Sequence, residues 1–336
     1  MTNFKQYFRA HIKATIKPII YILTSVLIFT WLLGNTYQQS TIYNNELNQT
    51  EINYKSILYL PVVFMCILAY IIPVMEFSFF KKRINLDCAY SMPISRKAMG
   101  AIHYLVGLLI LWCSFTLSYL TNAALLLSRG PGWFDFAPMI EHYFLCFALG
   151  TAIYSMMVFV FNEANTRGDG IWFMLLNTFI VNIVLNAIAY ITDIEFKYAL
   201  GSLPWHIFTK IDIEYQSLVE LRTADRSAFW GSDASIIWFV FWILIGIASA
   251  VAFFLTFGKR RMEKVEECSD SYFGFCTLIP LYAISAMIIF NASNNIIWWV
   301  VIEALTFIGY TIYRRGFHYK KSDIAILCMM FIFLFL

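Results

Sequence analysis

Long apolar runs recur along almost the whole chain and constrain its fold more than any other feature. A helix needs about 20 mostly apolar residues to cross ~30 Å of hydrocarbon, and runs near that length leave no room for a large soluble domain. The composition agrees, because 60% of the residues are hydrophobic and 13% are charged, whereas soluble domains carry about 45–50% and about 25%. We therefore predict an all-α, polytopic helical membrane protein in which residues 1–336 form a single transmembrane domain.

The apolar runs predict eight transmembrane helices. The predicted spans are residues 19–33, 57–74, 101–127, 140–161, 171–191, 236–257, 273–290 and 296–313. A last apolar run, 324–336, is shorter than the ~17–25 residues usual for a crossing, so it remains an open ninth candidate.

The basic residues predict the orientation of the chain, because cytoplasmic loops of membrane proteins are enriched in lysine and arginine. With the N-terminus in the cytoplasm, all but six of the 24 lysines and arginines fall on the inner side. The six exceptions are Lys55, Arg129, Lys197, Lys210, Arg222 and Arg226. The acid-rich segment 193–235 is then extracellular, with a possible surface helix over 206–222. The basic, amphipathic segment 1–18 is expected along the inner membrane face.

A polar and basic segment, residues 76–100, interrupts the apolar pattern between the second and third spans. Pro93 lacks an amide proton and disfavours helix at the residue before it, so the chain should break there. Ser95 is placed to cap a new helix that starts at Arg96 and continues into the third span. Glu76, at the inner end of the second span, is expected to pair with the basic residues of this segment.

The part of this segment before Pro93 has the pattern of an interfacial helix, with an apolar side on membrane or partner and a charged side in water. Phe77, Phe79, Phe80, Ile84 and Leu86 are interspersed there with Lys81, Lys82, Arg83 and Asp87.

The sequence SMPISR, residues 91–96, resembles the small-Leu-Pro-Ile-Ser-Arg element in the first cytoplasmic loop of type-2 ABC exporter permeases. Met92 replaces the usual leucine, the specific match covers about residues 76–107, and the extra spans are closer to a Gram-positive subgroup of these permeases. The resemblance implies that a separate ATP-hydrolysing subunit docks on this loop. The implied coupling residues are Glu76, Arg83, Asp87, Ser91, Pro93, Ile94, Ser95 and Arg96.

The resemblance further implies a permease subunit in a bacterial cytoplasmic membrane. It would export an amphipathic or hydrophobic compound such as a peptide, an antibiotic or a lipid-linked molecule. Its partners would be cytoplasmic ABC ATPase subunits, a second permease copy or paralogue, and membrane lipid, with no nucleic acid. The chain has no GxxxxGK[ST] pattern, so it is not expected to be an enzyme or to carry a cofactor, and ATP and Mg²⁺ would be held by the partner ATPase.

Polar residues inside predicted spans are candidates for a translocation path. Asn182 and Asn186 lie one turn apart in the fifth span, and they either line such a path or join helices by hydrogen bonds. Glu303 is a carboxylate well inside the eighth span, where it is either functional or a protonated acid bonded to a neighbouring helix. The five histidines show no metal-binding spacing such as HExxH, so no metal site is predicted.

Two other interpretations of the chain remain open at this stage. The element at 91–96 could be a proline-stopped loop that anchors a span through Arg96 and Lys97. The whole chain could instead be a membrane-embedded enzyme acting on lipid, with Glu303 and His103 as its chemical groups, or a secondary transporter without a motor.

Overall fold

The computed structural model describes residues 2–36, 40–44, 49–53, 59–129, 136–192, 203–211, 233–259, 265–269, 271–291 and 296–333. Within these ranges the elements are helices apart from one hairpin, so the predicted all-α fold is confirmed. The hairpin joins β1 (Ser40–Asn44) to β2 (Gln49–Asn53), with Ser40 opposite Asn53, in the loop after the first span. Most of the surface helix predicted at 206–222 lies outside the described residues.

The helices follow the predicted spans along the chain. They are α1 (Thr2–Thr36), α2 (Tyr59–Phe77), the 3-10 helix η1 (Ser78–Lys81), α3 (Arg83–Tyr90), α4 (Arg96–Arg129), α5 (Phe136–Glu163), α6 (Arg167–Thr192), a helix over 204–211, α9 (Asp233–Thr256), the 3-10 helix η3 (Phe257–Lys259), α10 (Phe275–Asn291), α11 (Ile296–Arg314) and α12 (Lys321–Phe333).

Six helices in the described part of the chain are long and apolar enough to cross a membrane. They lie at α1, α2, α4, α5, α6 and α9, which correspond to the first six predicted spans. The seventh and eighth predicted spans are also helical, but α10 is a shorter apolar helix and α11 falls outside the six. The described residues thus contain the helices of a polytopic membrane protein, and six of the eight predicted spans meet both criteria there.

Helix α1 differs from the prediction around Pro18. The segment expected to lie along the membrane, 1–18, and the first span form one continuous helix of 35 residues with Pro18 inside it. A proline is tolerated inside a membrane helix because neighbouring groups satisfy the backbone carbonyl that it frees. At 1.5 Å per residue α1 is ~52 Å long, more than the ~30 Å of hydrocarbon, so its basic first turns can still extend beyond the hydrocarbon into a membrane interface.

The chain forms two compact units, which are described separately. Unit 1 comprises Met1–Glu76, Tyr90–Val158 and Pro204–Gly258, and unit 2 comprises Phe77–Ala89, Phe159–Leu203 and Lys259–Leu336. The division between the units falls inside α5, so this helix contributes to both.

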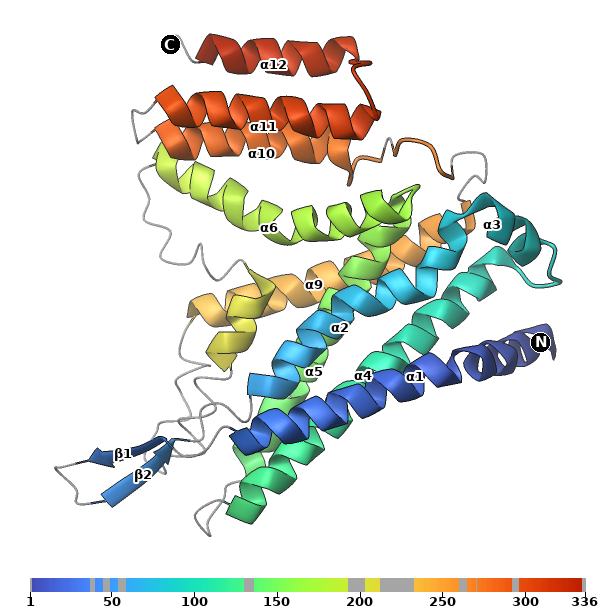
Figure 1. Cartoon of the computed structure of the whole chain (residues 1–336), viewed down its shortest axis with the longest axis vertical. Helices are drawn as coiled ribbons and strands as arrows, with labels where there is room; N and C mark the ends of the chain where they lie inside the picture. Colours follow the sequence, from blue (N-terminus) through green and yellow to red (C-terminus); the bar gives the residue numbers. More distant parts are fainter. Residues whose placement is uncertain are drawn as a thin grey trace. The chain divides into compact units, whose positions relative to one another are not determined.

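In unit 1 the long helices pack closely along one another. α1 lies along α4 (Figure 1), and the hydroxyl groups of Thr30 and Ser118 are 2.9 Å apart between them. A side chain at Gly246 of α9 would overlap the backbone of Ala152 in α5, so only glycine permits this approach. Small residues at such crossings are characteristic of helix packing in membranes, where direct van der Waals contact is a main source of association.

In unit 2 helix α10 packs on both α6 and α11, and α12 packs on α11 (Figure 1). Four buried side chains form the core of the last three helices: Ala283, Met287, Ile302 and Met330. Because α12 supplies Met330 to this core, the short final helix is packed into unit 2 through its side chains.

An ion pair joins α11 to the start of α12. The guanidinium of Arg314 donates from Nε to Oδ2 of Asp323 at 2.8 Å and from a terminal nitrogen to Oδ1 at 3.1 Å. Both side chains are at most 10% exposed, and Oδ2 also accepts from the amide of Lys320 at 3.0 Å. Burial alone would raise the pKa of Asp323, but the hydrogen bonds and charge of Arg314 outweigh it and hold that pKa below its ordinary value.

We expect this pair to make the stability of unit 2 fall in acid. A carboxylate whose pKa is lower in the folded state stabilises the fold above its unfolded pKa, and this contribution disappears as the pH falls below about 4. Asp323→Asn should destabilise the protein by about 3–5 kcal/mol at neutral pH, because it leaves Arg314 buried without its counter-charge. Thermal unfolding in detergent, followed as a function of pH, measures both effects.

Glu267→Gln is the matched control for Asp323→Asn. Its carboxylate also faces an arginine, Arg83 at 3.6 Å, but is 59% exposed, so the change should be within about 1 kcal/mol. Equal losses of stability in the two variants would contradict the proposed role of the ion pair. So would an Asp323→Asn variant whose stability falls in acid as much as that of the wild type.

Candidate functional site

The segment between α2 and α4 is not the single interfacial helix that the sequence predicted. α2 ends at Phe77, η1 follows, and the backbone becomes extended at Lys82 (φ −122°, ψ 130°) before α3 begins. The polar and apolar residues therefore lie on two short helices. The buried side chains of Phe80, Lys81 and Leu86 are at most 3% exposed, whereas Ile84, expected on the apolar side, is 74% exposed.

Lys81 explains this break and corrects the prediction that its charge lies in water. Its ammonium group is buried and donates hydrogen bonds to three carbonyl oxygens, those of Phe161 at 2.7 Å, Asn162 at 3.1 Å and Ala164. These carbonyls lie in or just beyond the last turn of α5, where backbone acceptors have no partner within the helix. A lysine there satisfies the acceptors and faces the negative end of the helix dipole.

Arg83, an implied coupling residue, is tied instead to another segment of unit 2. Its Nε donates to the carbonyl of Val265 at 3.0 Å, and its guanidinium lies 3.9 Å from Glu266 and 3.6 Å from Glu267. All three charged side chains are more than half exposed, so the ion pairs contribute little to stability. The hydrogen bond from Arg83 to the backbone carbonyl of Val265 is therefore the main contribution of this side chain to holding the start of α3.

The turn that joins α3 to α4, residues 91–95, is presented on the surface. The side chains of Ser91, Pro93, Ser95 and Arg96 are exposed, and Ile94 is intermediate. Asp87 on α3 is also exposed. Most of the residues that the resemblance assigns to coupling are thus accessible from solvent.

Ser95 caps α4 as the sequence predicted. Its hydroxyl oxygen accepts a hydrogen bond from the amide of Ala98 at 3.2 Å, and its carbonyl accepts from the amide of Met99 at 3.0 Å. α4 then continues without interruption for 34 residues, which corresponds to ~51 Å at 1.5 Å per residue. Near its start, Gly100 lies against the ring of Phe257, where a larger residue would not fit.

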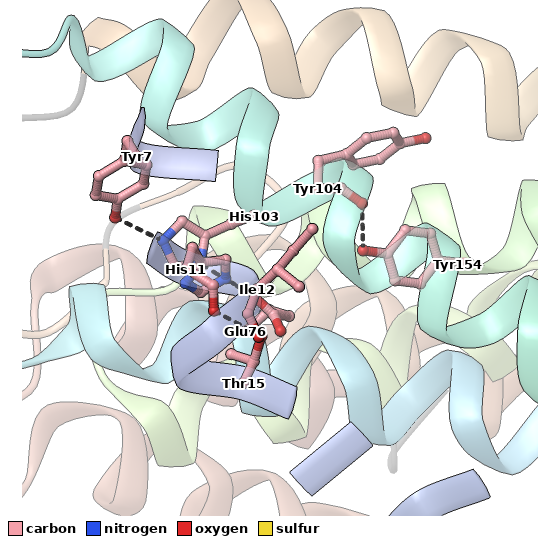
Figure 2. Close-up of polar contacts among 8 residues, drawn as sticks. All are labelled: Tyr7, His11, Ile12, Thr15, Glu76, His103, Tyr104 and Tyr154. Atoms are coloured by element: carbon pink, nitrogen blue, oxygen red, sulfur yellow. Dashed lines mark hydrogen bonds and ion pairs between the residues drawn. The ribbon is translucent and has the colours of Figure 1, made fainter. Parts of the chain in front are cut away.

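Glu76 does not pair with the basic residues of the segment, which corrects the prediction. Figure 2 shows its carboxylate between two histidines: Oε2 lies 2.9 Å from Nε2 of His11 and 3.1 Å from Nδ1 of His103. The other nitrogen of His103 lies 3.2 Å from the hydroxyl of Tyr7. Glu76 is 6% exposed and His103 is 4% exposed. Burial requires such partners, because an isolated carboxylate is costly away from water.

Sequence reasoning missed this cluster because its members are distant along the chain. His11 and Glu76 are 65 positions apart, and Glu76 and His103 are 27 apart. The 3.6-residue period of the hydrophobic pattern predicts that each of these residues lies on a helix, but it does not show which helices pack together. A weak signal was available, since His103 and Glu76 were both expected near the inner ends of neighbouring spans.

Two further polar contacts involve Tyr104, the residue after His103 in α4. The hydroxyl of Tyr154 on α5 donates to the backbone carbonyl of Tyr104 at 3.0 Å (Figure 2), and the Tyr104 hydroxyl lies 2.7 Å from that of Ser155. These bonds join the first turns of α4 to α5 at the residue that follows His103.

The residues predicted for a translocation path are all in unit 2. The amide of Asn186 donates to the backbone oxygen of Asn182 at 2.9 Å and to its side-chain oxygen at 3.1 Å, so the two bond to each other along α6. Nearby, Asn177 joins segments, since its amide donates to the carbonyl of Phe273 at 3.1 Å. Glu303 is half-buried on α11, and no described contact joins it to the asparagines.

We expect Lys81→Met to destabilise the protein by about 1–3 kcal/mol, because it leaves buried carbonyl oxygens at the end of α5 without a donor. Lys82→Met is the matched control, since the neighbouring lysine is exposed and its loss should cost less than about 0.5 kcal/mol. Unfolding in detergent measures both. If the two variants unfold at the same temperature, the three carbonyl bonds do not support the fold.

We expect Ser95→Ala to loosen the first turn of α4 at a cost of about 0.5–2 kcal/mol, because the cap on the Ala98 amide is lost. Hydrogen exchange of the amides of Lys97, Ala98 and Met99 should become faster. Ser95→Asp keeps an acceptor at the same place and should retain slow exchange. Unchanged exchange in Ser95→Ala would show that the hydroxyl does not cap the helix.

No known family model, curated protein or solved structure matches this chain. Its function is therefore inferred from its own residues and their geometry.

Proposed function

We propose that this chain is the membrane-spanning permease subunit of an ATP-driven ABC exporter. One observation carries the proposal: the exposed turn 91–95 leads directly into a capped and uninterrupted helix that is long enough to cross a membrane. A stiff rod with an accessible end is what a soluble motor needs in order to move a helix inside the bilayer.

The contacts on either side of the turn support this role. Lys81 anchors the chain before the turn through three buried hydrogen bonds, and Ser95 starts the rod after it. A force applied by a partner to the turn would therefore displace α4 rather than deform a loose loop. The exposed charges of Asp87, Arg96 and Lys97 offer polar contacts to such a partner.

The motor in this proposal is a separate polypeptide. The sequence contains no GxxxxGK[ST] loop to cradle ATP, so cytoplasmic ABC ATPase subunits would hold ATP and Mg²⁺. A second permease copy or a paralogue would complete the complex. The subunit would lie in a bacterial cytoplasmic membrane with its N-terminus and the turn in the cytoplasm.

Apolar pockets in unit 2 support a hydrophobic or amphipathic cargo such as a peptide, an antibiotic or a lipid-linked molecule. One pocket of ≈ 720 Å³ lies between α6, α10, α11 and α12 and is lined by residues such as Ile284, Met287 and Trp299. Another of ≈ 460 Å³ is lined by α6, α10 and α11. Asn182, Asn186 and Glu303 line neither of these two pockets, so within unit 2 the apolar pockets are the better candidates for cargo contact.

The proposal predicts that an ATPase with a Walker A motif co-purifies with the chain when it is extracted gently from its native membrane. The double variant Arg96→Glu, Lys97→Glu should lower the amount of recovered ATPase at least about tenfold. Reversing two charges at the rim of a protein–protein interface costs a few kcal/mol of binding free energy. Mass spectrometry of the purified complex measures the ratio of the two proteins.

The matched control is Lys13→Glu, Lys17→Glu on α1. Both lysines are exposed, and both pairs are expected on the cytoplasmic side, so the two double variants change the charge balance across the membrane equally. The control should retain the ATPase. Absence of any ATPase from the wild-type sample, or equal loss in both variants, would overturn the proposal.

A further inference from the structure

Three metal-ligating side chains converge in unit 1 from three helices. His11 comes from α1, Glu76 from the end of α2 and His103 from the start of α4 (Figure 2). Their ligand atoms all lie within 4.8 Å of one another. We propose that these residues bind one divalent transition-metal ion of the Zn²⁺ type, independently of whether the chain is a permease.

The donor set fits such an ion. Imidazole nitrogens and a carboxylate oxygen are common ligands of Zn²⁺, and two histidines with one carboxylate leave a fourth position for water. Soft thiolates are absent from this group, which favours an N/O-binding divalent ion over a thiophilic one such as Cu⁺. Glu76 is the one carboxylate in the group, so it offsets one of the two charges of a bound Zn²⁺.

The distances from the two histidine nitrogens to the Glu76 carboxylate are close to those in a metal site. Tetrahedral Zn²⁺ with bonds of about 2.0–2.1 Å holds its ligand atoms ~3.3 Å apart. The two nitrogens lie 2.9 and 3.1 Å from Oε2 of Glu76, a few tenths of an ångström less than this, and all three ligand atoms lie within 4.8 Å of one another. The rings of His11 and His103 have centroids 4.0 Å apart and are tilted by 52°, so the two imidazoles lie against each other.

Both histidine nitrogens converge on one oxygen of the Glu76 carboxylate. A carboxylate offers about four lone-pair sites over two oxygens, so two donors have room to take one oxygen each. Here both histidine nitrogens instead point to Oε2. All three ligands are then directed to the same small volume, as they are around a single cation.

Tyr7 supplies the outer contact that a metal-bound histidine usually makes. If Nδ1 of His103 binds the ion, the proton of the neutral ring is carried by Nε2, which lies 3.2 Å from the Tyr7 oxygen and can donate to it. The proton only moves from one ring nitrogen to the other, so no other acceptor is required. The Tyr7 ring also stacks on His11 at 6.2 Å, so one residue orients both histidines.

A bound ion would fasten α1 to the ends of α2 and α4 that flank the exposed segment. Glu76 is next to the last residue of α2, and His103 is in the third turn of α4. Metal occupancy would thus set how firmly the N-terminal helix holds these two helix ends.

The test uses the full chain without a polyhistidine tag, purified in detergent, stripped with a chelator and equilibrated with Zn²⁺ alone. We expect wild type to retain one ion per chain and to show a higher unfolding temperature with Zn²⁺ than without it. Co²⁺ in place of Zn²⁺ should give the visible spectrum of a four-coordinate site. Elemental analysis and competition with a chromophoric chelator measure stoichiometry and affinity.

Three variants and one control separate the site from the other histidines of the chain. His11→Gln and His103→Gln keep a hydrogen-bonding group but should weaken Zn²⁺ binding at least about 100-fold, and Tyr7→Phe should weaken it by about 10–100-fold, as expected for a lost outer partner. His142→Gln changes a buried histidine on α5 that contacts Tyr119 at 3.0 Å and should leave the affinity unchanged.

The apo proteins are compared first by gel filtration and unfolding, so that binding is scored only for folded chains. His11 is the ligand with the most exposed side chain, at 12%, so His11→Gln provides a folded comparison even if His103→Gln does not fold. If folded wild type retains no more Zn²⁺ than His11→Gln, the proposal is wrong and the three residues form a hydrogen-bonded cluster only.

Discussion

Buried charge in an apolar bundle must be neutralised where it lies, and this requirement shapes the segment between α2 and α4. Lys81 is 2% exposed and Glu76 is 6% exposed, although both belong to a stretch that reads as a polar loop. The ammonium of Lys81 satisfies carbonyls at the end of α5, while the carboxylate of Glu76 is held by two histidines. An ion left alone at either place would be too costly to bury.

These two sites explain why a segment rich in charge has so little freedom. After α2, the chain is fixed by Lys81, turns at Lys82 and is fixed again by the contact of Arg83 with Val265. The exposed turn follows, and Ser95 then starts a helix of 34 residues. The result is a short accessible turn between restrained ends, which is the geometry that the proposed motor contact requires.

Much of this organisation could be predicted from local patterns. The first six spans follow from apolar runs of sufficient length, and each corresponds to a helix that meets the criteria for crossing. The start of α4 follows from Pro93 and Ser95, because both act on the backbone within a few residues. The prediction over residues 77–86 was wrong, since the interfacial pattern assumed that Lys81 faces water and instead it faces the end of α5.

By itself, the sequence determined the helical class, the approximate helix positions and the cap of α4, because hydrophobic length and capping chemistry depend on neighbours along the chain. Only the tertiary structure decided the partners of the buried polar groups. His11 meets Glu76 across 65 positions and Lys81 meets Phe161 across 80, and helical periodicity carries no information about which helices pack together. The tertiary structure also decided that α1 continues through Pro18, because surrounding contacts settle whether a proline ends a helix or is accommodated within it.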